Sequence, residues 1–134
     1  MIDEKTYELA YNELSRRACC KEDERLCIEK ETNNIIRCNQ NGLWTGFFYV
    51  DDDLTSEADR CYNENVGFNA ASKIETKKRI VDICVESAKK KKIMLVEGPF
   101  DGKHYIMHSI IDNKKVMDAN ETVEQLAISY ELNH

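Results

Sequence analysis

The sequence predicts a single α+β domain in which helices pack on a small antiparallel sheet. Helical periodicity of apolar residues is found mainly in the first part of the chain, and short apolar runs bounded by turn residues follow residue 92. Helices and strands that are segregated along a chain are typical of α+β proteins. A length of 134 residues is enough for one domain, 1–134, with its own core.

Residues 1–40 are predicted to form a helical part of this domain. An amphipathic stripe at i, i+4, i+7 and i+11 predicts a helix from about Asp3 to Cys20, and its members are Tyr7, Tyr11, Leu14 and Ala18. A second helical segment is expected over Leu26–Ile36. The run Asn39–Gly42 should end it, because Asn and Gly favour turns.

The middle of the chain is predicted to be helical, with an interruption or kink at Gly67 as an open alternative. The aromatic-rich segment Leu43–Val50 is consistent with either a strand or a buried loop. Thr55 or Ser56 is a suitable helix N-cap. A long amphipathic helix should then reach about Lys91, with an apolar face that includes Ile80 and Cys84.

The last third of the chain predicts the strands. Ile93–Glu97 is a short apolar strand that Gly98 and Pro99 end. The runs Tyr105–Ile111 and Lys115–Ala119 flank a turn at Asp112, Asn113 and Lys114, which predicts a β-hairpin. Asn120 is expected to cap a last helix, whose apolar stripe is formed by Val123, Leu126, Ala127 and Tyr130.

This hairpin predicts a histidine beside an aspartate. With a three-residue loop, His108 lies directly across from Asp118 and on the same face. Directly opposed residues have Cβ atoms about 5 Å apart, so a carboxylate can hydrogen-bond an imidazole. Such a bond fixes the orientation of a general base.

A cysteine could complete this pair. Cys61 falls near the N-terminal end of the predicted middle helix, where the helix dipole lowers a thiol's pKa. Cys61 is therefore the candidate nucleophile, with Cys38 as a rival, and His104 could replace His108 as the base. Asn63 and Gln40 are candidate donors to an oxyanion.

Two motifs strengthen this interpretation: Arg60-Cys61-Tyr62-Asn63, and the block from Met94–Gly98 to His108–Asp118. Over roughly residues 58–121 they resemble the papain-like/transglutaminase-like superfamily. The resemblance implies a papain-like α+β fold and a Cys-His-Asp part over about 55–121. It also implies thiol-dependent acyl transfer on a protein or peptide amide, without a cofactor: amide hydrolysis, deamidation or transglutamination. By analogy of fold, a bacterial effector or toxin, or a phage protein, would suit such a domain.

Composition excludes several other classes. The formal net charge of −6 argues against nonspecific binding to nucleic acid. No apolar run approaches about 20 residues, so we expect no transmembrane helix and no membrane partner. The polar, acidic first residues do not resemble a signal peptide, which predicts a cytoplasmic protein with free thiols. The cysteine spacings do not match those of zinc ligands, so no metal site is expected.

The alternative function is a noncatalytic, acidic protein-binding module, such as an immunity or inhibitor protein. The acidic net charge and the run Asp51–Asp53 would suit a basic partner.

Overall fold

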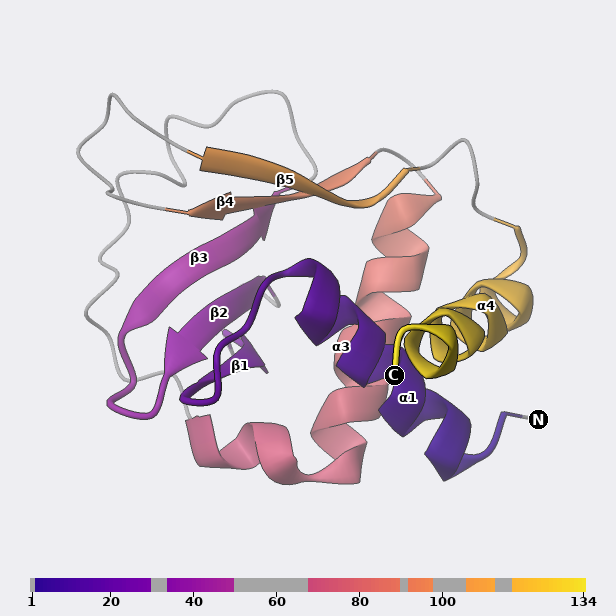
Figure 1. Ribbon diagram of the computed structural model, residues 1–134, viewed down its shortest axis with the longest axis horizontal. Coiled ribbons are helices and arrows are strands. Elements are labelled where there is room, and N and C mark those ends of the chain that lie inside the picture. Colours follow the sequence, from indigo (N-terminus) through magenta and orange to yellow (C-terminus); the bar gives the residue numbers. More distant parts are fainter. Residues whose placement is uncertain (1, 30–33, 50–67, 90–91, 98–105, 113–116) are drawn as a thin grey trace.

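The computed structural model describes residues 2–29, 34–49, 68–89, 92–97, 106–112 and 117–134, and these form an α+β domain. Its sheet is antiparallel throughout, as predicted (Figure 1). The described helices are α1 (Glu4–Arg17), α3 (Ile74–Ala88) and α4 (Ala119–Leu132), and a short 3-10 helix, η1 (Phe68–Ser72), precedes α3.

Among the described residues, the sheet contains five strands in sequence order. They are β1 (Glu24–Ile28), β2 (Ile35–Asn39), β3 (Trp44–Tyr49), β4 (Ile93–Glu97) and β5 (Ile106–Ile111). The prediction of a strand over Ile93–Glu97 is confirmed, and the aromatic-rich segment is β3.

The predicted helix over Leu26–Ile36 is wrong, because Leu26–Ile28 lie in β1 and Ile35 and Ile36 lie in β2. Neighbouring apolar residues in these strands are buried on opposite faces of the sheet. Leu26 packs in the core on the helix side, and Cys27 packs in the cluster on the other side. Two buried faces produce continuous apolar runs, which are easily mistaken for one side of a helix.

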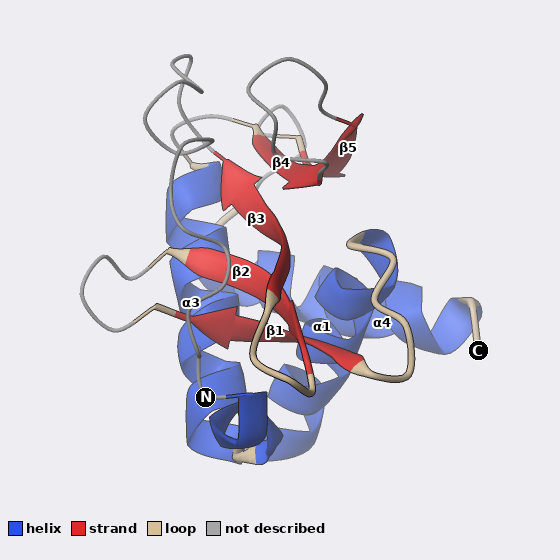
Figure 2. Ribbon diagram, turned by 90° about the vertical axis from the view of Figure 1, so that its left-hand side faces the viewer, coloured by secondary structure: helices blue, strands red, loops and turns tan. Residues whose placement is uncertain are grey.

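Helices α1 and α3 pack on one face of the sheet, and α4 lies beside α1 (Figures 1 and 2). Tyr11, Leu14, Val123 and Leu126 are buried there, as the helical stripes predicted. The second apolar cluster lies on the opposite face and includes Trp44, Phe47 and Val96. The sheet therefore has a core on each side.

Aspartates cap α1 and α4. The side chain of Asp3 accepts a hydrogen bond from the backbone N–H of Thr6 at 2.8 Å, close to the predicted start of the first helix. Asp118 caps α4 in the same way and accepts from the N–H of Glu121 at 2.9 Å. The prediction that Asn120 caps this helix is therefore wrong by two residues.

A buried carboxylate ties α1 to β5. Glu13 is fully buried and accepts hydrogen bonds from Arg16 and Arg17. Nη1 of Arg17 then donates to the carbonyl of Ile110 at 2.9 Å. In the pairing of β4 with β5, the register shifts so that Ile110 has no partner residue. Arg17 therefore supplies a hydrogen bond at a β-bulge.

The cysteines differ from the expectation of free thiols. Cys27 and Cys38 form a disulfide between β1 and β2. Cys19, Cys20 and Cys84 are free. Among the described helices, none combines the length and the apolar character that crossing a membrane requires.

Candidate acid–base site

A second β-bulge places an arginine within the sheet. Arg37 pairs with Gly46 and Cys38 pairs with Trp44, so Thr45 has no partner residue across the ladder. The Arg37 side chain hydrogen-bonds to Thr45 instead. Its Nη2 donates to the Thr45 carbonyl at 2.9 Å, and its Nε donates to the Thr45 hydroxyl at 3.0 Å. Both interactions hold the guanidinium on the helix-covered face.

Arg37 is only 6% exposed, so its charge needs further partners. Nη1 donates to the carbonyl of Ala18 at 2.6 Å, at the end of α1, where the helix dipole is negative. Nη2 also donates to Oε2 of Glu97 at 2.6 Å, and Nε lies 3.4 Å from Oε2 of Glu24. A charge with this many partners is fixed in position.

Gly46 lets the arginine reach Glu97 across β3. A Cβ at this position would lie 3.1 Å from Cδ1 of Leu95 and 3.2 Å from the carbonyl of Val96. It would also lie 3.7 Å from Cζ of Arg37. A side chain here would therefore crowd both β4 and the guanidinium.

Glu97 joins the arginine to His108. It is the last residue of β4, and its Oε1 lies 3.2 Å from Nε2 of His108 on β5. Partial burial raises the pKa of Glu97, but the hydrogen bonds from Arg37 and His108 outweigh burial and hold the pKa below its usual range. Glu97 is therefore an anion at neutral pH.

The geometry decides which imidazole nitrogen carries the proton. An ionised carboxylate can only accept hydrogen bonds, so Nε2 of His108 must donate. In neutral His108, Nδ1 then carries the lone pair. The side chain is 37% exposed, so solvent or a substrate can reach it. A histidine oriented by a carboxylate in this way can act as a general base and then as a general acid.

The structure does not pair His108 with Asp118. Asp118 caps α4 instead of continuing a hairpin strand, so the prediction that the two residues are cross-strand neighbours is wrong. The backbone N–H of Glu121 holds the pKa of Asp118 below its usual range. His108 lies opposite Leu95 and interacts with Glu97.

The other predicted site residues are mostly outside the described part of the chain. Cys61, Asn63 and His104 all fall there. Gln40 is exposed in the turn after β2. Cys38 is bonded to Cys27, so the rival nucleophile has no free thiol.

Two of the free cysteines do not suit nucleophilic chemistry. Burial raises the pKa of Cys20 to about 12. Burial also raises the pKa of Cys84, which lies on the apolar side of α3. Thiols with raised pKa values are mainly protonated at neutral pH and react slowly.

Sequence reasoning missed Arg37 and Glu97. The signal was present, since each is a charged residue in or next to a strongly apolar strand: Ile35 and Ile36 precede the arginine, and Ile93–Val96 precedes the glutamate. A charge in such a place usually has a buried partner.

Comparison with known proteins gives no relative: no protein family, curated protein or solved structure matches the chain. Within the described ranges, no group of His, Cys, Asp and Glu side chains is arranged to hold a metal ion.

Proposed function

We propose that this protein is a thiol-dependent acyl-transfer enzyme that uses Cys61 as the nucleophile and His108 as the acid–base group. The observation that carries the proposal is the hydrogen-bonded row from Arg37 through Glu97 to His108. It supplies an oriented and accessible imidazole, which is what a cysteine nucleophile requires. The motif resemblance around Cys61 supplies the thiol.

The proposed reaction has two stages. His108 takes the proton of the Cys61 thiol, and the thiolate attacks an amide carbonyl to form a C–S bond. The imidazolium then protonates the leaving amine as the C–N bond breaks, which leaves a thioester. In the second stage His108 deprotonates water or an acceptor amine, which attacks the thioester, and the thiolate leaves. Water as acceptor gives a peptidase or deamidase, and an amine gives a transglutaminase.

We assign the orienting role to Glu97 in place of Asp118. The carboxylate of Glu97 contacts the imidazole, whereas that of Asp118 binds the first turn of α4. Arg37 acts on the imidazole only through Glu97, so it is a positioning residue. Its buried charge keeps Glu97 ionised and fixed.

The test is alkylation of the native protein with iodoacetamide at neutral pH, followed by peptide mapping. Cys61 should react at least about tenfold faster than exposed Cys19, because a neighbouring imidazolium favours the thiolate. Replacement of the base by His108→Gln should remove this excess rate. Cys19→Ala is the matched control and should leave the rate at Cys61 unchanged. Rates that follow exposure alone, or a fast Cys61 that ignores His108→Gln, would contradict the proposal.

One observation favours the second candidate, a noncatalytic protein-binding module. Helix α4 exposes Ile128 and Leu132 one turn apart, and Leu132 is 82% exposed. Exposed apolar side chains on one helix face are typical of contacts with another protein. The alkylation experiment separates the candidates, because a binding module needs no fast cysteine.

A further inference from the structure

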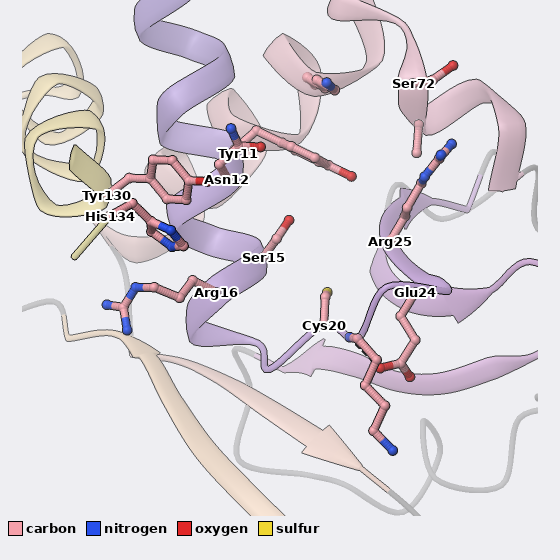
Figure 3. Close-up of a pocket in the computed structure, with 13 residues that line it drawn as sticks. Tyr11, Asn12, Ser15, Arg16, Cys20, Glu24, Arg25, Ser72, Tyr130 and His134 are labelled. Carbon is pink, nitrogen blue, oxygen red and sulfur yellow. Dashed lines mark hydrogen bonds between the residues drawn. The ribbon is translucent and has the colours of Figure 1, made fainter. Parts of the chain in front are cut away.

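Helix α4 exposes two apolar side chains on the side that points away from α1. Tyr130 lies toward α1 and stacks on His134 at a centroid distance of 4.2 Å (Figure 3). Ile128 and Leu132 each stand two positions from Tyr130, so with about 3.6 residues per turn they point to the opposite side of the helix. Ile128 is 47% exposed and Leu132 is 82% exposed. The two residues form a short apolar stripe that is open to solvent.

Two glutamates lie along this apolar stripe. Glu124 stands one turn before Ile128, and Glu131 stands one turn after it. The two glutamates are therefore on one line of the helix, about 10 Å apart along its axis. Between Ala119 and Leu132 the helix contains no lysine or arginine. The outward face of α4 thus combines apolar surface with negative charge.

These two carboxylates differ from several on the other helices. Surface carboxylates of α1 and α3 are paired with lysines: Glu4 with Lys78, Glu8 with Lys77, and Glu86 with Lys89. Within the described chain, Glu124 and Glu131 have no cationic partner. Glu131 also lies in the last turn of α4, where the negative end of the helix dipole disfavours a carboxylate. A cation from another molecule would compensate both charges.

We propose that this face of α4 binds a basic amphipathic helix of another protein. Apolar side chains of such a helix would cover Ile128 and Leu132, as in other complexes where a helix contributes apolar anchors. Lysines or arginines two turns apart on the same helix would match the spacing of Glu124 and Glu131. Charge complementarity selects this occupant, because a second copy of α4 would place carboxylates against carboxylates.

This surface goes beyond the proposed acyl transfer and does not depend on it. Neither Cys61 nor His108 belongs to α4. The binding experiment below uses no cysteine reactivity, so its failure would leave the alkylation experiment unaffected. Uniformly slow alkylation, in turn, would leave the binding result unaffected.

The test is a fluorescence anisotropy titration of a labelled synthetic helix with the full chain. The peptide carries leucines on one face and lysines on the other. One matched peptide has glutamates in place of the lysines, and a second has serines in place of the leucines. We expect saturable binding of the first peptide and at least about tenfold weaker binding of both matched peptides, since each lacks one of the two complementary features.

Substitutions on α4 locate the binding face. Glu124→Gln combined with Glu131→Gln should weaken binding by at least about fivefold, and Leu132→Ser should do the same. The matched control is Glu22→Gln combined with Glu75→Gln, which removes two exposed carboxylates outside α4. It should change the affinity by less than about twofold. All the substituted side chains are exposed, and circular dichroism checks that each variant is folded.

Three outcomes would overturn the proposal. The first is the absence of saturable binding of the leucine–lysine peptide. The second is an equal loss of affinity in the control pair, which would indicate a general effect of net charge. The third is self-association in analytical ultracentrifugation that Leu132→Ser abolishes, because the face would then join two copies of this chain.

Discussion

The imidazole Nε2 of His108 and the carboxylate Oε1 of Glu97 lie 3.2 Å apart on neighbouring strands. The other oxygen of the same carboxylate accepts a hydrogen bond from Arg37. The glutamate is thus shared between a permanent, buried cation and a titratable ring. Both interactions depend on the negative charge of Glu97, so a change at Glu97 affects Arg37 and His108 together.

Glu97 should make stability sensitive to acid. Its pKa in the folded protein lies below the ordinary value of 4.5, so the unfolded chain binds more protons in the acid range. Its contribution is therefore complete above that ordinary value and is lost as the pH falls through the lower, folded-state pKa. Glu97→Gln should cost about 1–3 kcal/mol at neutral pH and make stability fall less steeply in acid. Urea unfolding at several pH values measures this, and exposed Glu131→Gln is the control. Parallel pH curves for Glu97→Gln and the original protein would contradict the prediction.

Asp118 should behave as a helix cap. Asp118→Ala should lower the melting temperature because the N–H of Glu121 loses its acceptor. Asp118→Asn keeps an acceptor oxygen and should have little effect. The pair Asp3→Ala and Asp3→Asn should reproduce the same contrast at α1. If Asp118→Asn instead slowed alkylation of Cys61 without changing the melting temperature, Asp118 and not Glu97 would be the residue that orients His108.

Leu126 should anchor α4 to the core. It is 3% exposed, and Leu126→Ala should cost about 2–5 kcal/mol of unfolding free energy through lost burial and a cavity. Leu132→Ala on the same helix is the control, since that side chain is exposed, and should change stability by less than about 0.5 kcal/mol. Denaturant melts measure both. Similar losses for the two variants would mean that α4 is not seated as described.

The Cys27–Cys38 disulfide should protect these two cysteines from alkylation until a reductant is added. Peptide mapping before and after reduction shows whether Cys27 and Cys38 are alkylated only in the reduced protein. Joint replacement by alanine should cost about 2–3 kcal/mol, the usual range for a bridge that closes a short loop. Labelling of both cysteines in unfolded, unreduced protein would show that the bridge does not form in solution.

The described helices were largely predictable because each has one apolar stripe, although Asp118, which caps α4, was assigned to a strand. Strand β4 was also predictable, since Ile93–Glu97 is short, apolar and followed by Gly98 and Pro99. The first two strands were not, because both of their faces are buried and the period of two is lost. The continuous apolar run in this region was therefore interpreted as one helix instead of two strands.

The candidate site was predictable only in part. His108 could be selected from its apolar strand, but its partner depended on strand register. The hairpin argument chose Asp118, which in the structure begins α4. The position of Arg37 in an apolar strand indicated a buried partner, but the partners themselves could not be assigned, since they follow from the bulge at Thr45 and the close approach at Gly46.

Within the described sheet, β5 is an edge strand, and edge strands are templates for pairing with a strand of another molecule. The bulge at Ile110 interrupts the regular ladder, and Arg17 already occupies the carbonyl of that residue. A flat, uninterrupted row of backbone groups is therefore not offered along this strand. The bulge and the hydrogen bond from Arg17 therefore make this strand a less regular template for intermolecular β-structure.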